Sequence, residues 1–219
     1  MAIDIAAIDH VLTTTRSVRK RLDFSRPVPE TLVQECIDIS LQSPTGSNAQ
    51  GWRVMVVTDA AKRKALADLY KKGFDMYREM NMSPQHAEGD IRAKQMPRVI
   101  DSATYLAEHL HEAPVMVIYL IEGRMEAAPT IMQASIYGSV LPAAWSFMLA
   151  ARARGLGSAW PTIHLFFEKE ASELLGIPES FTQTVLLPVA YFKGEEFKPA
   201  HRVSPRQLTY WNQWGKTRG

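Results

Sequence analysis

Residues 130–157 read TIMQASIYGSVLPAAWSFMLAARARGLG, and this stretch predicts a long helix followed by a glycine-bounded turn. The helix is expected over Thr130–Arg154, where apolar residues dominate, as in a helix buried on most of its surface. Pro142 removes one backbone donor, so we expect a bend near it. Gly155 and Gly157 are expected to end the helix.

Shorter elements flank this helix on both sides. Apolar periodicity and turn residues predict helices over residues 4–14, 29–41, 59–72 and 167–175, and buried strands over 53–58, 115–121 and 184–192. Pro29 fits a first helical position, Asp59 an N-cap and Gly176 a helix stop. The chain therefore combines several helices with few strands.

Two stretches do not follow this pattern. Residues 73–104 are polar, rich in methionine and weakly periodic, which is typical of a mobile lid or a partner-covering arm. The tail over residues 197–219 carries Tyr210, Trp211 and Trp214, more aromatic surface than a free terminus tolerates. We expect the tail to pack on its own core or on a neighbouring subunit, as part of one domain that spans residues 1–219.

Composition excludes several classes of protein. With 219 residues, 46% hydrophobic and 22% charged, and a net charge of +2, the chain is expected to fold as one domain and not to bind nucleic acid. Cys36 is the only cysteine, which excludes an intrachain disulfide and favours a reducing compartment. The first residues lack a signal-peptide pattern, and stretches such as 114–121 are too short to span a bilayer. A soluble, cytoplasmic protein is the expectation.

The usual catalytic patterns are absent from the sequence. The six histidines form no HExxH or other metal-ligand spacing, and neither a GxSxG elbow nor a Walker loop occurs. The glycines of 155–158 follow a predicted helix and not a strand, so they fail the context of a dinucleotide loop. We therefore expect no metal ion and no catalytic side chain, and chemistry supplied by a bound cofactor.

Four clusters contain residue types suited to a phosphorylated ligand. Residues 16–21 (RSVRKR) combine guanidinium groups with a hydroxyl, which match phosphate oxygens. Residues 43–52 (SPTGSNAQGW) are rich in hydroxyls, carboxamides and glycine, which allow close approach to a polyhydroxylated ligand. Residues 155–164 (GLGSAWPTIH) offer backbone amides, and residues 198–206 (KPAHRVSPR) form a basic turn. Taken singly, these stretches are weak signals: residues 16–21 and 155–164 are more often ordinary solvated or structural turns, and residues 43–52 are as often an ordinary helix-to-strand turn.

In order and spacing, the clusters resemble the nitroreductase family of flavoproteins from about Asp9 to Gly215. That family opens with Arg-Arg-Ser-hydrophobic-Arg and continues with Ser-Pro-Ser/Thr-x-x-Asn-x-Gln-x-Trp. Its long helix closes in Ala-x-x-x-Gly-Leu-Gly, found here at residues 151–157, and Leu-Gly-Ile-Pro follows at 175–178. A basic, proline-containing turn then precedes a tryptophan-bearing arm.

The resemblance implies a role for each matching residue. Arg16, Ser17 and Arg202 would hold the phosphate of FMN, with His201 as a helper. Arg19 would lie near the N1–O2 edge of the flavin, where a cation stabilises the reduced anion. The ring and ribityl chain would be lined by Pro44, Thr45, Gly46, Asn48 and Gln50. The backbone near Trp160, Pro161 and Thr162 would approach the N5–O4 edge.

Three positions depart from the family pattern. Thr15 replaces the first arginine of the opening motif, which leaves phosphate binding one cation short unless the second chain or Lys20 compensates. His164 stands where many relatives have glycine, which puts the shape above the ring in doubt. The family's further polar contacts have no clear match between Tyr70 and Lys94.

The resemblance further implies an α+β nitroreductase fold, with a mostly antiparallel central sheet flanked by helices. FMN would sit at the interface of a homodimer, and the C-terminal arm over residues 197–219 would cross to the other subunit. Such a dimer accounts for the aromatic tail and for the apolarity of the long helix. The alternative is that Trp211 and Trp214 cover their own domain.

The implied activity is transfer of electrons from NADH or NADPH, through flavin N5, to a small electron-poor acceptor such as a nitroaromatic or a quinone, by a ping-pong mechanism. A reductive dehalogenase similar to iodotyrosine deiodinase is the alternative, with Tyr77, Glu79 and Lys94 as substrate contacts. More distant alternatives are a flavin-destroying enzyme of cofactor biosynthesis, a flavin-binding protein without turnover and a structural protein without flavin.

Overall fold

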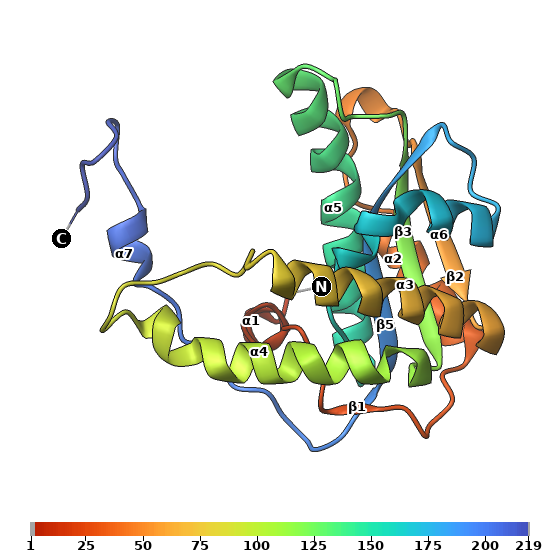
Figure 1. Ribbon diagram of the computed structural model, residues 1–219. Coiled ribbons are helices and arrows are strands. Elements are labelled where there is room, and N and C mark those ends of the chain that lie inside the picture. The colour runs from red at the N-terminus through yellow and green to blue at the C-terminus, as the bar shows by residue number, and fades with distance from the viewer. Residues whose placement is uncertain (1–2, 219) are drawn as a thin grey trace.

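The computed structural model describes residues 3–218, in which an antiparallel sheet lies between two layers of helices (Figure 1). The main helices are α1 (Ile5–Thr14), α2 (Glu30–Ser40), α3 (Ala60–Glu79), α4 (Ile91–His109), α5 (Thr130–Ala153), α6 (Glu168–Leu175) and α7 (Pro205–Leu208). The strands are β1 (Leu22–Asp23), β2 (Trp52–Val57), β3 (Val115–Glu122), β4 (Leu156–Ser158) and β5 (Phe181–Phe192). Short 3-10 turns cover Gly46–Asn48 (η1), Leu110–Glu112 (η2) and Ile163–Phe167 (η3). The predicted α+β fold is confirmed.

The strand order is β1-β5-β3-β2, and β4 also pairs with β5. All of these ladders are antiparallel, with Tyr119 of β3 opposite Val54 of β2 and Val185 of β5. A single parallel bridge joins Ser17 to Ser158, because Val18 N donates to the Ser158 carbonyl at 2.7 Å. This bridge fixes the RSVRKR cluster beside the turn that follows α5.

Alternate residues of β3 face different helices. Val117, Tyr119 and Ile121 pack in one cluster with α2 and α5, whereas Ile118 and Leu120 pack in a second cluster with α3 and α4. Both faces of the strand are therefore buried, which explains its continuous apolar run. Among residues 3–218, α5 alone is long and apolar enough to cross a membrane by composition, and 44% of its apolar window is buried within this chain, against α2 and the sheet.

The helix predicted to end at Lys72 continues to Glu79, so that prediction was too short. Leu66, Tyr70 and Phe74 carry its buried stripe onward at helical spacing, and the ion pairs Lys64–Asp68 and Lys71–Asp75 support the exposed face. Together with α4 this makes most of residues 73–104 helical, and only about 80–90 lack a helix. The lid itself stays a prediction.

Other boundaries differ by smaller amounts. The helix α5 ends at Ala153, and Gly155, two residues beyond it, adopts a φ of 75°, whereas Gly157 lies within β4. The strand β5 begins at Phe181, three residues before the predicted start at Thr184. The sequence did not reveal β1 or β4, because two- and three-residue strands have no periodicity to detect. Helix α5 runs through Pro142 without interruption.

The C-terminal tail does not cover the core of its own chain. Figure 1 shows α7 and the residues after it lying away from the sheet. Trp211 is 46% exposed and Trp214 is 85% exposed. The alternative in which both tryptophans cover their own domain is therefore wrong for this chain taken alone.

Candidate functional site

A basic cavity of about 430 Å³ lies where the start of the chain, α4 and the C-terminal turn meet. We call it the arginine cavity. It brings together five of the residues predicted to bind the cofactor, namely Arg16, Ser17, Arg19, His201 and Arg202. Helix α4 adds Gln95, Arg98, Val99 and Ser102, and the turn adds Lys198, Pro199 and Ala200. No acidic residue of the described chain lines it, so an anion is its natural ligand.

Hydrogen bonds hold the two distant ends of the chain around this cavity. Arg16 Nη1 donates to the Lys198 carbonyl at 3.0 Å, and Gln95 Nε2 donates to the His201 carbonyl at 3.3 Å. Arg19 Nη1 donates to Ser102 Oγ at 3.3 Å, which ties the same loop to α4. The cationic groups are thus positioned by neighbours and still face solvent.

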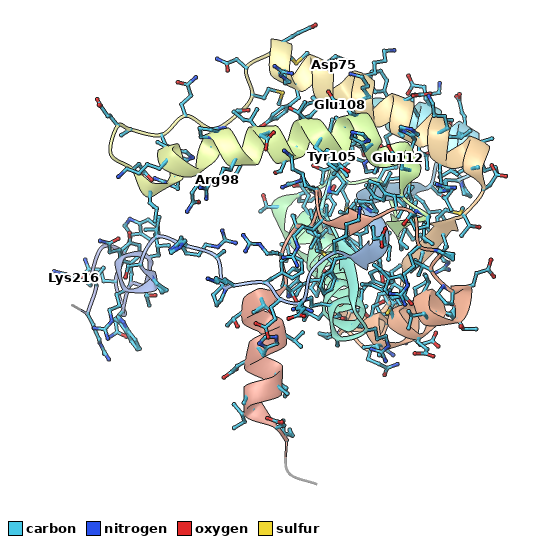
Figure 2. The ribbon with its side chains drawn as sticks, turned by 90° about the horizontal axis from the view of Figure 1, so that it is seen from below. Asp75, Arg98, Tyr105, Glu108, Glu112 and Lys216 are labelled. Atoms are coloured by element: carbon cyan, nitrogen blue, oxygen red, sulfur yellow. The ribbon has the colours of Figure 1, made fainter. Side chains whose placement is uncertain are left out.

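Two residues near the cavity are engaged elsewhere. Lys20 Nζ lies 2.6 Å from Asp101 Oδ2, so its charge is already compensated. Thr15 Oγ1 donates to the Val11 carbonyl at 2.6 Å and closes the end of α1. The side chain of Arg98, in contrast, makes no ion pair or hydrogen bond with any residue from 3 to 218 and lines the cavity. Figure 2 shows its side chain on the underside of α4, toward the C-terminal turn.

A second cavity, of about 560 Å³, lies between α3, α4 and the segment after β4. We call it the α3–α4 cavity. It contains the predicted residues Trp160, Pro161 and Thr162, and it shares Arg19 and Val99 with the arginine cavity. Its other lining residues are Tyr70, Phe74, Tyr77, Arg78, Asn81, Ser83, Pro84, Met96, Ile100, Ala103, Leu106 and Ile163. Most of this surface is apolar.

Arg19 and Tyr70 both line the α3–α4 cavity, and they are close enough for their charges to interact. Burial raises the pKa of Tyr70 to about 12, an effect that the nearby Arg19 charge partly offsets. Burial also lowers the pKa of Arg19 from its usual value. The phenol therefore stays protonated at neutral pH, and its hydroxyl makes no hydrogen bond within the described residues. A buried phenol without a partner in its own chain is a donor available to a ligand.

A third, apolar hollow of about 580 Å³ lies along α5 and is open to solvent. Tyr137, Gly138, Leu141, Pro142, Trp145 and Met148 line it, together with Ser17 and Trp160. Ser17 also lines the arginine cavity, and Trp160 also lines the α3–α4 cavity. The three hollows therefore adjoin one another. The arginine cavity is cationic, and the α3–α4 cavity and the α5 hollow are largely apolar.

The remaining predicted residues lie in the loop before β2, which packs against α5. Pro44, Thr45, Gly46, Asn48 and Gln50 line none of these three hollows. Gly46 N donates to Ser139 Oγ at 3.0 Å, which places the loop against the first half of α5. Ser47, Asn48 and Gln50 all have positive φ, at 52°, 54° and 50°, which is strained for residues with side chains. One chain thus gathers two separate groups of the predicted residues.

His164 is fully buried beside the α3–α4 cavity and does not line it. Burial lowers its pKa to about 4, although Glu168 acts in the opposite direction. Neither ring nitrogen has a partner within the described chain. The neutral imidazole is therefore part of the support beneath residues 160–163. On the same segment, a Cβ on Gly73 would lie 2.7 Å from the Ile163 carbonyl, so glycine lets α3 approach closely.

Sequence reasoning missed the contributions of α3 and α4 to the site. Gln95, Arg98 and Ser102 recur at spacings of three and four, and so do Tyr70, Phe74 and Tyr77. Such spacing places the members of each set on one helix face. The signal was present, but the methionines and charged residues between these positions concealed it.

The sequence of this chain is similar to those of known proteins. The model of the nitroreductase family matches residues 12–191. An NADH dehydrogenase of Thermus thermophilus is 28% identical, over 90% of this chain and 91% of that protein.

Two solved structures share the fold. An oxidised iodotyrosine deiodinase bound to FMN and 3-iodo-L-tyrosine has a TM-score of 0.68 at 21% identity, covering 91% of this chain and 98% of the other. An FMN- and NADPH-dependent nitroreductase of a sphigopyxis sp. strain HMH has a TM-score of 0.69 at 20% identity, covering 94% of this chain and 99% of the other.

Proposed function

The chain belongs to the nitroreductase family, and on that premise we propose that it is an FMN-dependent oxidoreductase. It passes electrons from NADH or NADPH to a small electron-poor acceptor, such as a nitroaromatic or a quinone. The observation that carries this proposal is the row of three adjoining hollows, one of which is lined by Arg16, Arg19, Arg98 and Arg202 and by no acidic residue of the described chain. A phosphorylated, largely flat apolar group fits such a row in both charge and shape.

The arginine cavity fits the phosphate. Arg16, Arg202 and the Ser17 hydroxyl supply donors of the kind that phosphate oxygens accept, and His201 lies beside them. Lys20 is not free to replace the missing first arginine of the motif, because it is paired with Asp101. Arg98 takes that place in the proposal, since it lines the cavity without an ionic partner in the described chain.

The α3–α4 cavity fits the ring. When bound, FMN supplies hydride acceptance and electron transfer, with donor and acceptor using the same face in turn. Arg19 brings a positive charge to the deep end of the cavity, and the Tyr70 hydroxyl brings a hydrogen-bond donor. Trp160 and Pro161 form a wall that keeps water from one side. No side-chain acid or base is required for the hydride step.

A cytoplasmic homodimer is part of the same proposal. The loop of Pro44, Thr45, Gly46, Asn48 and Gln50 lies apart from the arginine cavity of its own chain, so it would serve the site of a second copy. Exposed apolar residues provide a surface for that copy: Ile5 and Ile8 on α1, Ile131 on α5, and Trp211 and Trp214 on the tail. The open α5 hollow belongs to the same surface.

The dehalogenase alternative receives less support. Of its three suggested substrate contacts, Tyr77 lines the α3–α4 cavity, and its hydroxyl donates to the Met82 carbonyl at 3.1 Å. Glu79 and Lys94 do not line the cavity of the described chain. A zwitterionic substrate needs a carboxylate and a cation together, and the lining offers only cations.

The test begins with the absorbance spectrum of the purified protein and FMN content by mass spectrometry. Anaerobic titration with NADH and NADPH is expected to bleach the bound flavin, and nitrofurazone is expected to restore its colour. Restoration by iodotyrosine and not by nitrofurazone would favour the dehalogenase. A flavin that neither donor bleaches would indicate a binding protein without turnover. Colourless protein that takes up no FMN would refute the proposal.

A further inference from the structure

The charged side chains that line the α3–α4 cavity are all positive. Its lining within residues 3–218 includes two arginines, Arg19 and Arg78, and no aspartate or glutamate. Arg19 is half-buried at the deep end, where it bonds to Ser102 and belongs to the cofactor site in the proposed function. Arg78 lies on the last turn of α3 and is exposed, so it stands at the mouth.

The side chain of Arg78 has no ion-pair partner among the residues that the structure describes. It makes no side-chain hydrogen bond or ion pair with any residue from 3 to 218. Arg92, Arg124 and Arg154 form ion pairs with Asp90, Glu168 and Glu35, whereas Arg78, like Arg98, forms none within residues 3–218. An unpaired guanidinium on the rim of a cavity is a ready partner for an incoming carboxylate.

The walls between the two arginines favour a flat apolar body. Phe74, Met96, Val99, Ile100, Ala103 and Ile163 surround the space, and its volume is about 560 Å³. This size and this lining are typical of a pocket for a small aromatic molecule. Asn81 and Ser83 at the mouth are neutral, so they do not oppose an anion.

From these observations we infer that the preferred electron acceptors are aromatic carboxylates, whose ring stacks on the exposed face of the flavin ring within the α3–α4 cavity and whose carboxylate binds Arg78. The inference rests on the proposed function and narrows its acceptor class. Arg78 is a specificity residue here: it recognises a charge remote from the reacting group. A neutral aromatic acceptor would bind through the walls alone.

The test compares 4-nitrobenzoate, 4-nitrobenzamide and 4-nitrobenzylamine, which share a ring and nitro group and differ in charge. Since the substituents also change the reactivity of the nitro group, the informative quantity is the ratio of kcat/KM for acid over amide, compared between variants. Arg78→Gln is expected to lower that ratio about tenfold, as loss of one charge-assisted contact does. Arg78→Glu is expected to favour the cationic amine. High salt should weaken the preference of the unaltered protein.

Arg92→Gln is the matched control, because Arg92 is an exposed arginine that pairs with Asp90 and lines neither cavity. It should leave the acid-to-amide ratio unchanged. Isothermal titration of the three compounds into the purified protein gives the same comparison without turnover. Selective carboxylate binding lost in Arg78→Gln would support the inference even if no nicotinamide-driven turnover occurred, in which case only the proposed function would fail.

Equal acid-to-amide ratios in the unaltered protein and in both Arg78 variants would overturn the inference, and turnover of the neutral amide would leave the proposed function standing. A rise in the KM of NADPH in Arg78→Gln, with an unchanged acid-to-amide ratio, would also overturn it. That outcome would assign Arg78 to the phosphates of the electron donor.

Discussion

The residues of the arginine cavity and of the loop over residues 43–50 were both predicted to bind one cofactor, yet the two regions are held in place by different kinds of contact. The cavity is assembled from three distant parts of one chain, tied by Arg16 to Lys198 and by Gln95 to His201. The loop is local and exposed, and three of its residues have positive φ. The first region is held by long-range contacts, and the second stores local strain.

In the proposed dimer the two regions would be complementary half-sites. Strain in an exposed loop persists where surrounding structure or a ligand compensates for it. A basic cavity with no acidic lining likewise needs an anion. If a second copy brings its loop to the cavity, both requirements are met at once. The following predictions test that relation, from the largest expected effect to the smallest.

Replacing Trp211 and Trp214 together by Ser should separate the proposed dimer and release FMN. Large aromatic anchors at an interface contribute about 2–4 kcal/mol each, so the pair should weaken association by about 4 kcal/mol or more. Sedimentation velocity at micromolar concentration, with the flavin-to-protein absorbance ratio, measures both effects. Lys216→Ser is a control on the same exposed tail. A doubly substituted protein that stays dimeric and yellow would remove the tail from the interface.

Replacing Arg16 and Arg202 by Ala should weaken FMN binding without separating the dimer. Each charge-assisted contact to phosphate contributes about 1.5–3 kcal/mol, so the pair should raise the Kd by at least ~100-fold. Fluorescence quenching of added FMN gives the Kd. Arg92→Ala should bind FMN normally, since Arg92 lines neither cavity. Unchanged affinity in the double variant would move the phosphate away from this cavity.

Sequence alone predicted the parts of the fold that have a repeating pattern. The strands β2 and β3 and the helices α2 and α5 agree within a residue or two, because each presents a continuous or periodic apolar face. The strands β1 and β4 were missed, since their position depends on partners such as Tyr191 that lie far along the chain. The end of α3 was misplaced because the polar residues between Tyr70 and Phe74 obscured a buried stripe.

For the site, the family motifs identified residues that lie at fixed spacings within short stretches of the sequence. Arg16, Arg19 and Arg202 were named from the motifs, and the fold brings them to one cavity. Arg98 was not named, because a single arginine in a polar helix gives no signal until α4 is placed beside the C-terminal turn. Sequence also gave no indication that the 43–50 loop would lie apart from the arginine cavity. That separation is a property of the three-dimensional arrangement.

His164, beside the α3–α4 cavity, predicts a pH dependence of stability. Its pKa is lowered from 6.5 to about 4 by burial, so the folded protein resists protonation that the unfolded chain accepts. Stability from this residue is complete above pH 6.5 and is lost as the pH falls toward 4, by about 3 kcal/mol. Urea unfolding at pH 7 and pH 4.5 measures the loss. His164→Leu should reduce the difference, and an equally steep profile in that variant would assign it to other groups.

Replacing Gln50 by Gly should stabilise the chain while weakening cofactor binding. Gln50 has a φ of 50°, a conformation that costs residues with a side chain about 1–2 kcal/mol. Glycine removes that strain, and it also removes the bond from Gln50 Nε2 to Asn48 Oδ1 at 2.9 Å. We expect a higher Tm without FMN and a higher Kd for FMN. Ala49→Gly is the control, because Ala49 has an ordinary helical φ of −67°. A Tm that falls in the Gln50 variant would show that the loop is not strained.

Tyr70→Phe should give the smallest effect, because Tyr70 belongs to the α3–α4 cavity and to neither half-site compared above. The substitution keeps the ring, which is buried and stacked with Phe74, and deletes only a hydroxyl without a partner in the described chain. Stability should therefore stay the same, while loss of one neutral hydrogen bond to the cofactor should cost about 1 kcal/mol. Since that donor faces the region of Arg19, the midpoint potential of bound FMN should become more negative in the variant. Spectroelectrochemistry measures the potential, and thermal unfolding measures stability. An unchanged potential with lowered stability would make Tyr70 a structural residue and leave Arg19 as the sole donor proposed for the deep end of the cavity.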